Sequence, residues 1–254
     1  MTSSRLTLGL ASGLVAGLAL AAPADAFDIG AMSAPEREAF GEAVRSYLME
    51  NPEVLVEAIT VLEQRQFAQA AENDGALIAM NRDAILDDGH SWVGGNLEGD
   101  VTLVEFVDYR CGFCRRAHPE VEALIAQDGN IRLILKEFPI LGEQSTLASR
   151  FAVAVQQQAG DDSYKAAHDA LMELRGDVTI PTLERLAGEL GLDAPAVIAH
   201  MNAESVSEVL RANHQLAERL RISGTPTFIL EDQMLRGYLP LEGMQEMVAA
   251  VRDN

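Results

Sequence analysis

The sequence predicts an α/β fold, on the evidence of one strand, one helix and a series of further helices. Residues 101–107 form a run of β-branched and apolar side chains, which is typical of a buried strand. A short turn separates this strand from residues 114–127, whose apolar side chains recur with helical spacing. Four more helix-like stretches follow between residues 139 and 224, and residues 227–231 again have the composition of a strand. Strands that alternate with helices define the α/β class.

Length and charge limit the kinds of partner. A chain of 254 residues can form one substantial core and a smaller appended element. Its formal net charge of −20 at pH 7 repels the phosphates of nucleic acid and anionic lipid surfaces. We therefore expect neither of these as a partner.

The N-terminus has the pattern of a signal peptide over residues 1–26. Arg5 is the only charged residue before an apolar run over residues 6–22 that is rich in Ala, Gly and Leu. The Ala-Asp-Ala sequence at 24–26 then fits the rule of small residues before a cleavage site. A retained membrane anchor is the alternative, although the run is short for a span. We expect an exported, periplasmic protein that is cleaved after Ala26.

Residues 27–90 contain helix signals and no strand pattern. Pro35 opens one helix, and Pro52 opens a second helix with Asn51 as its N-cap. An apolar stripe with a seven-residue period runs through both helices, at Leu48, Leu55 and Leu62. Such a stripe needs burial, so we expect this segment to form a homo-oligomer, with a trimer favoured over a dimer. Packing against the rest of the chain is the alternative.

Cys111 and Cys114 are the only cysteines, and three roles compete for them. As a structural disulfide they would close a four-residue loop, for which loop-closure entropy gives only about 2 kcal/mol. As half of a zinc site they would need more Cys or His ligands, and no two of the five histidines have the usual spacing. As a redox pair at a helix start, the first sulfur would lie beside free N–H groups that stabilise a thiolate. Their place between a strand and a helix favours the redox pair.

In this setting the residues resemble the thioredoxin fold, and specifically the DsbA-like periplasmic group. The dithiol follows the first core strand, with Glu105 six residues before Cys111 and Pro119 eight residues after it. The Gly-Thr-Pro-Thr-Phe sequence at 224–228 resembles the cis-proline loop that faces the dithiol in this group. Residues 234–238 and 241–251 resemble its closing strand and helix.

The helix-like stretches resemble the helical insert that separates DsbA-like proteins from plain thioredoxin. We expect helices at residues 143–158, 162–174, 182–190 and 194–220, the last one broken near residues 202–204. The resemblance implies a DsbA-like thioredoxin domain over 91–254, with an inserted helical domain at about 143–221. The N-terminal helical segment, 27–90, resembles that of the ScsC group and related Com1-like proteins, in which such a segment can mediate oligomerisation.

The resemblance also implies roles for residues near the dithiol, without a metal or cofactor. Cys111 and Cys114 would form the redox-active disulfide. Glu105 would manage a proton for Cys114, and burial would raise the pKa of its carboxyl; an edge carboxylate facing water is the alternative. Client proteins would bind along a cis Pro226, for which an ordinary turn proline is the alternative. The implied substrate-binding residues are Gly112, Phe113, Thr225 and Pro226.

Three charged or titratable residues follow the dithiol on the same helix. Arg115 and Arg116 could lower the pKa of a thiol by proximity, but a solvated helix face is the favoured interpretation. His118 lies one turn after Cys114 and is interpreted as a surface or structural residue rather than a catalytic base.

The direction of electron flow is predicted from the residues beside the cysteines. Gly112-Phe113 is similar to the Gly-Tyr of periplasmic isomerases and unlike the Pro-His of strongly oxidising DsbA, and Thr225 is also isomerase-like. We therefore favour a disulfide isomerase or reductase, with a dithiol oxidase as the alternative. A copper-binding protein or a chaperone is the alternative of another class. The expected partners are client proteins with disulfides or thiols and a membrane protein that reduces or oxidises the dithiol.

Overall fold

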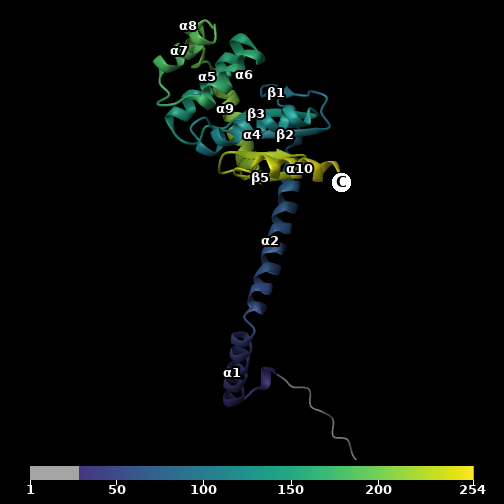
Figure 1. Ribbon diagram of the computed structural model, residues 1–254. Helices are drawn as coiled ribbons and strands as arrows, with labels where there is room; N and C mark the ends of the chain where they lie inside the picture. Colours follow the sequence, from purple (N-terminus) through teal and green to yellow (C-terminus); the bar gives the residue numbers. More distant parts are fainter. Residues whose placement is uncertain (1–28, 254) are drawn as a thin grey trace, which may run out of the picture. The chain divides into compact units, whose positions relative to one another are not determined.

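A computed structural model describes residues 29–253 (Figure 1), so the predicted signal peptide over residues 1–26 lies outside the described residues. The chain divides into two compact units, residues 1–61 and 62–254, which are described separately. Among the described residues, no helix combines the length and apolar character that a membrane span requires.

The first unit is helical, as predicted. It contains a 3-10 turn, η1 (Ile29–Ala31), the helix α1 (Ala34–Glu50) and the start of α2 (Glu53–Met80). Ser33 caps α1: its backbone N–H donates to Glu36 Oε2 over 2.8 Å and its hydroxyl donates to the same oxygen over 2.6 Å. The side-chain amide of Asn51 donates to the carbonyl oxygen of Tyr47 over 2.9 Å. Asn51 therefore caps the end of α1, and the prediction that it is the N-cap of the next helix is wrong.

The second unit contains a five-stranded mixed sheet in the order β1-β3-β2-β4-β5. β2 and β3 are parallel, and every other neighbouring pair is antiparallel. The strands are β1 (Trp92–Gly95), β2 (Val101–Val107), β3 (Ile131–Glu137), β4 (Thr227–Leu230) and β5 (Gln233–Arg236). The strand predicted at 101–107 is confirmed, whereas β1 and β3 were not predicted. The closing strand ends before Gly237, whose φ of 100° takes the chain out of the extended conformation.

Helices cover the sheet and form the predicted insert. α4 (Gly112–Asp128) follows β2, and α10 (Leu241–Arg252) closes the fold. α5 packs against α6, α8 and α9 (Figure 1). The bounds of the insert agree with the predicted helices to within two residues, including the break at 201–203. These helices are α5 (Glu143–Ala159), α6 (Asp161–Glu173), α7 (Ile180–Glu189), α8 (Ala194–His200) and α9 (Glu204–Arg219).

The side chains of β2 alternate between the two faces of the sheet, and each face packs against a different hydrophobic core. Leu103 and Val107 lie in the larger hydrophobic core, which includes the buried side of α4 with both cysteines. Val104 and Phe106 lie in a second core on the opposite face of the sheet. Since side chains alternate along a strand, Glu105 shares the face of Leu103 and Val107. The carboxyl group therefore projects into the layer that holds the dithiol.

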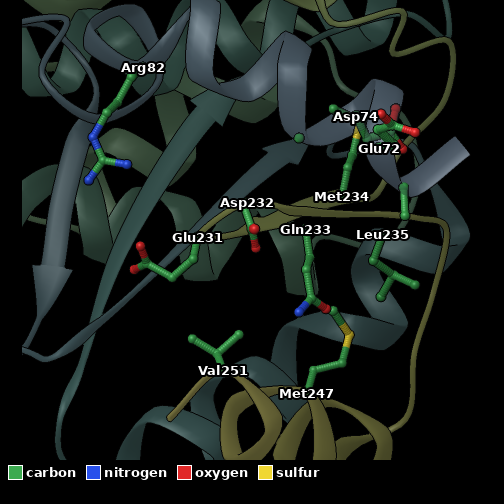
Figure 2. A pocket seen from close by; sticks show the side chains of 12 residues that line it. Glu72, Asp74, Arg82, Glu231, Asp232, Gln233, Met234, Leu235, Met247 and Val251 are labelled. Carbon is green, nitrogen blue, oxygen red and sulfur yellow. The ribbon is translucent and has the colours of Figure 1, made fainter. Parts of the chain in front are cut away.

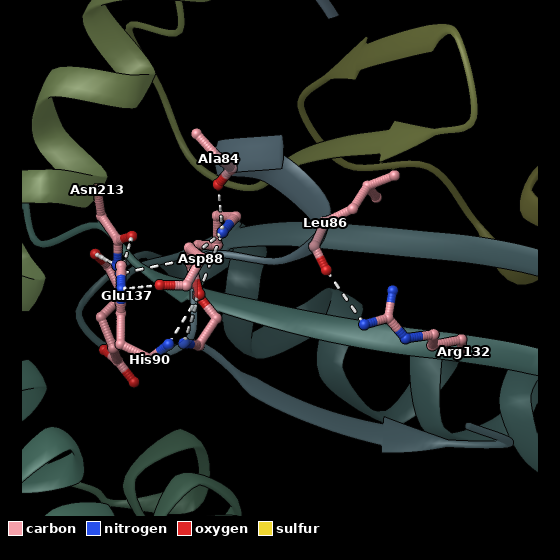
Figure 3. A network of polar contacts seen from close by, with 9 residues as sticks. Ala84, Leu86, Asp88, His90, Arg132, Glu137 and Asn213 are labelled. Carbon is pink, nitrogen blue, oxygen red and sulfur yellow. Dashed lines mark hydrogen bonds and ion pairs between the residues drawn. The ribbon is translucent and has the colours of Figure 1, made fainter. Parts of the chain in front are cut away.

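The compact unit begins earlier than the predicted domain boundary at residue 90. Ile78 of α2 and Ile85 of α3 (Arg82–Leu86) are buried in the second core. Lys136 on β3 is fully buried and donates to Asp88 Oδ2 over 2.5 Å and to the Ala84 carbonyl oxygen over 3.0 Å. Asp88 and Ala84 are labelled in the network of polar contacts in Figure 3. Burial opposes ionisation of Asp88, but the Lys136 ammonium outweighs it and lowers the pKa of Asp88 to about 2. Residues 78–88 are thus tied to the sheet by both apolar and ionic contacts.

Candidate active site

The two cysteines lie at the junction of β2 and α4, as predicted. Cys111 is the N-cap residue of α4, and Cys114 lies in its first turn. Both are free thiols, and Cys114 is completely buried. The first sulfur therefore lies at the end of the helix where backbone N–H groups have no partner within the helix.

Asp108 fixes the turn that carries Cys111. Its side chain is fully buried, and Oδ1 accepts a hydrogen bond from the Arg110 N–H over 2.8 Å. Oδ2 accepts from the N–H groups of Ile140 and Leu141 over 2.8 and 3.1 Å. The Asp108 carbonyl oxygen accepts from the N–H of Cys111 over 3.0 Å. Asp108 lies in the short turn that the sequence predicts after residue 107, and its partners near residue 140 leave no local signal.

The environment of Cys111 favours a thiolate. The Cys114 thiol contributes most, and the N–H groups of Cys114 and Phe113 add further hydrogen bonds to the sulfur. These bonds, with one from Thr225, outweigh partial burial and lower the pKa of Cys111 to about 5. The sulfur lies 3.1 Å from the carbonyl oxygen of Thr225. The Thr225–Pro226 peptide bond is cis, which confirms the predicted conformation.

Cys114 has the opposite character. Burial raises its pKa well above the usual range, and the hydrogen bond to Cys111 and the charge of Glu105 act in the same direction. Cys114 therefore remains a thiol while Cys111 is ionised. Of the two sulfurs, Cys111 therefore has the thiolate character that attack on a disulfide requires.

Glu105 is buried beside the dithiol, so the alternative of an edge carboxylate facing water is excluded. Its side chain is 2% exposed, and Oε1 has no hydrogen-bond partner. Burial chiefly, with repulsion from Glu122 and Cys111, raises the pKa of Glu105 to about 8. A carboxyl group with this pKa can hold or release a proton near neutral pH.

Two residues that follow the dithiol on α4 make contacts with the insert. Arg115 donates through Nε to the Met172 carbonyl oxygen over 2.8 Å and also contacts the Leu174 carbonyl, so it anchors α4 to the insert rather than facing solvent. His118 Nε2 lies 3.3 Å from Asp169 Oδ1, in agreement with the structural role predicted for it. The main causes of the lowered pKa of Cys111 are hydrogen bonds from Cys114, Thr225 and Phe113.

A second buried polar cluster lies between β3 and the insert, and no sequence pattern predicts it. Glu137 Oε1 accepts hydrogen bonds from Tyr109 over 2.6 Å and from Tyr164 over 2.7 Å. The Tyr109 hydroxyl also lies 3.1 Å from His168 Nδ1. Burial raises the pKa of Glu137 to about 7 and lowers that of His168 to about 3. These residues come from β3, from α6 and from the turn between β2 and α4, so no local motif connects them.

One group of potential metal ligands occurs within residues 29–253, and neither cysteine belongs to it. A nitrogen of His118, a nitrogen of His168 and an oxygen of Asp169 lie within 4.8 Å of one another. Lys165 Nζ donates to both oxygens of Asp169 over 2.7 and 2.8 Å. The Asp169 carboxylate is therefore already neutralised by an ammonium group.

A cavity of about 930 Å³ lies beside β5, between the second half of α2 and α10 (Figure 2). Gln233 and Met247 project into it, and Glu72, Glu231 and Asp232 give it an acidic margin. Neither cysteine lines this cavity, so it is separate from the dithiol site.

The sheet order, the dithiol at the start of α4 and the helices between β3 and β4 define a thioredoxin-fold protein of the DsbA type. Residues 102–249 match the sequence profile of the DSBA-like thioredoxin domain, and the chain belongs to that family. Residues 36–69 match the profile of the copper resistance protein ScsC N-terminal domain. Both matches confirm the resemblance drawn from the sequence.

Two solved structures illustrate the likeness. A thioredoxin-like oxidoreductase from Silicibacter pomeroyi DSS-3 is 41% identical, with a TM-score of 0.65 over 68% of this chain and 99% of that chain. BcfH from Salmonella enterica Typhimurium is 29% identical, with a TM-score of 0.68 over 84% of this chain and 94% of that chain.

Curated relatives include proteins of different length. Disulfide bond formation protein D of Bacillus subtilis is 23% identical over 164 residues, which are 61% of this chain and 73% of that protein. Na⁺/H⁺ antiporter NhaA 3 of Salinispora tropica is 26% identical over 163 residues, or 64% of this chain. The match is 25% of the antiporter, so the chain spans about a quarter of the length of that relative.

Proposed function

We propose that the protein is a thiol–disulfide oxidoreductase that acts on client proteins through Cys111 and Cys114. The observation that carries this proposal is the asymmetry of the pair, with a pKa of about 5 for Cys111 and a pKa for Cys114 raised well above its usual range. The Cys111 sulfur is thus ionised and able to attack a disulfide, while the Cys114 sulfur stays protonated until it resolves the mixed disulfide.

In the reducing direction, the Cys111 thiolate attacks one sulfur of a client disulfide. A mixed disulfide forms, and the second client sulfur leaves as a thiolate. Cys114 then loses its proton and attacks Cys111, which forms the Cys111–Cys114 disulfide and releases the reduced client. In isomerisation, a client thiolate attacks the mixed disulfide instead, and the dithiol is regenerated without net electron transfer.

Glu105 is suited to take the proton of Cys114 during resolution. Its pKa of about 8 lies close to neutral pH, and its charge already raises the pKa of Cys114. Thr225 and Pro226 would bind an extended client segment beside the Cys111 sulfur, which lies 3.1 Å from the Thr225 carbonyl oxygen. Gly112 and Phe113 are both exposed and complete the proposed client-binding residues.

Within this class, we favour isomerase or reductase activity over dithiol oxidase activity. The support is the Gly112-Phe113 dipeptide together with Thr225 before Pro226. The strong stabilisation of the Cys111 thiolate argues for the oxidase alternative, because it favours the reduced form over the disulfide. A direct comparison of the two activities is therefore the decisive measurement.

Two assays on the purified protein test the proposal: reactivation of a client with scrambled disulfides, and oxidation of the same client after full reduction. We expect reactivation to be the faster activity, and strong oxidation without reshuffling would establish the oxidase instead. Cys111→Ser should abolish both activities, and Cys114→Ser should accumulate mixed disulfides with clients. Full activity of Cys111→Ser in preventing client aggregation, with no exchange by the unaltered protein, would indicate a chaperone.

The remaining parts of the proposal concern location and assembly. We propose a periplasmic protein whose residues 1–26 are removed, whose residues 27–90 form a homo-oligomer and whose residues 91–254 carry the dithiol. Large apolar side chains on α1 and α2 support the oligomer: Tyr47, Leu55, Ile59 and Leu62 are each at least half exposed. A membrane protein would reduce or oxidise the dithiol between cycles. Linked active sites would raise the effective concentration of a captured client.

A further inference from the structure

An aromatic pair lies beside the dithiol and has no part in the exchange steps described above. Phe113 lies between the two cysteines, and its side chain is 59% exposed. Tyr238 lies between β5 and α10, with its ring centre 6.5 Å from that of Phe113 and an angle of 28° between the ring planes. The two rings come from segments 125 positions apart, yet they stack on each other, and Phe113 is two residues from Cys111.

Tyr238 is held in place by two residues of α4. Its hydroxyl donates to Glu120 Oε1 over 2.6 Å, and Glu120 Oε2 accepts from the N–H of Leu241 over 2.8 Å. Arg116 lies over the Tyr238 ring, with its guanidinium carbon 4.7 Å from the ring centre. Glu120 thus binds both ends of the Tyr238–Leu241 segment and fixes it against the active-site helix.

The same segment is tied to the loop that contacts the nucleophile. The N–H of Gly237 donates to the carbonyl oxygen of Pro226 over 2.9 Å. Pro226 follows Thr225, whose carbonyl oxygen lies 3.1 Å from the Cys111 sulfur. Tyr238 is therefore linked, through its neighbour Gly237, to the Pro226 backbone where a client segment is proposed to bind.

We propose that Tyr238, paired with Phe113, determines client specificity by binding a large apolar side chain next to the client cysteine. The occupant is an extended client segment that carries an aromatic or branched aliphatic residue beside its cysteine. Covering an exposed phenyl ring with such a side chain removes apolar surface from water, which favours these clients over ones with small residues. Glu120 is a positioning residue that acts through Tyr238. The inference rests on the proposed exchange activity.

The test uses two synthetic peptides that are identical except at the two residues flanking their single cysteine, Phe in one and Gly in the other. Each is supplied as a mixed disulfide with glutathione, and the protein carries Cys114→Ser so that only attack by Cys111 is measured. We expect the second-order rate constant for the Phe peptide to exceed that for the Gly peptide by about tenfold. Any change in the reactivity of the Cys111 thiolate affects both rate constants equally and therefore cancels in their ratio.

Tyr238→Ala should reduce this ratio to below about threefold, and Phe113→Ala, which removes a solvent-exposed ring, should do the same. Glu120→Gln should reduce the ratio in part, because the ring remains while its charged partner is lost. Leu97→Ala removes an apolar side chain that is equally exposed but lies before β2, and it should keep the full ratio.

The outcomes separate this inference from the activity on which it rests. If neither peptide reacts with the unaltered dithiol, the proposed exchange activity itself fails. If both peptides react at equal rates, or if the ratio survives in Tyr238→Ala and Phe113→Ala, the specificity role is overturned while exchange stands. If Tyr238→Ala does not fold, as judged by circular dichroism, Phe113→Ala decides alone.

Discussion

The sulfur of Cys111 lies 3.1 Å from the carbonyl oxygen of Thr225, although the two residues are 114 positions apart in the chain. The pairing of β2 with β4 brings them together, since Phe106 lies opposite Thr227 in the antiparallel ladder. The loop before β4 is thereby placed over the start of α4. The proposed nucleophile and the backbone proposed to bind clients then share one surface, as peptide recognition beside a reactive group requires.

The ionisation of Cys111 can be measured directly. We expect thiolate absorbance at 240 nm to appear with a midpoint near pH 5, and Cys111→Ser should remove it. Cys114→Ala should raise the midpoint, because the Cys114 thiol supplies the largest stabilising hydrogen bond. Arg116→Ala is the matched control and should leave the midpoint in place. A midpoint above 7 in the unaltered protein would contradict the proposed nucleophile.

Glu105→Gln should stabilise the protein at high pH. The pKa of Glu105 is raised from 4.5 to about 8 in the folded state, so Glu105 destabilises the fold increasingly between pH 4.5 and pH 8, with the full effect above pH 8. A shift of this size corresponds to at most about 5 kcal/mol of unfolding free energy at pH 9. Urea unfolding of both proteins at pH 4 and pH 9 measures the difference, which should be near zero at the lower pH.

The same variant should slow the second chemical step. Without the Glu105 carboxyl as proton acceptor, attack of Cys114 on the mixed disulfide should slow by at least about tenfold. Rapid quenching with acid, followed by mass analysis of the mixed disulfide over time, measures this rate. If the mixed disulfide decays at the same rate in Glu105→Gln and in the unaltered protein, Glu105 is not the proton acceptor.

Tyr109→Phe probes the buried cluster around Glu137. The change removes a 2.6 Å hydrogen bond to Glu137 and should cost about 1–3 kcal/mol of unfolding free energy. Because the bond from Tyr109 lowers a pKa that burial has raised to about 7, the loss should be larger above pH 7 than below it. Tyr47→Phe, at an exposed position, is the control. A loss that does not change with pH would mean that Glu137 stays protonated throughout.

The N-terminal helices should control the oligomeric state. Ile59→Asp combined with Leu62→Asp places charges on the exposed apolar side of α2, and we expect the mass from light scattering to fall to that of one chain. Glu57→Ala, elsewhere on the same helix, should leave the mass unchanged. A single-chain mass for the unaltered protein would refute the proposed assembly.

The sequence by itself determined the elements whose signals are local. The apolar run of β2, the helical spacing after Cys114 and the proline-marked starts of the insert helices are properties of neighbouring residues, and the structure has these elements where they were expected. The spacing of the two cysteines and Glu105, with Pro226 in its loop, was enough to indicate the family. Each of these patterns spans at most a few tens of residues, so tertiary contacts are not needed to detect it.

Only the tertiary structure decided which distant groups meet. Strand pairing places Thr225 at the Cys111 sulfur, and the insert carries Tyr164 and His168 to Glu137. The hydrogen bonds that fix Asp108, and those that join Tyr238 to α4, also connect residues more than 30 positions apart. Burial sets the pKa values of Glu105 and Cys114, and burial is a property of the packed fold rather than of the residue type. The dithiol could therefore be identified from the sequence, whereas the ionisation and surroundings of its sulfurs follow only from the fold.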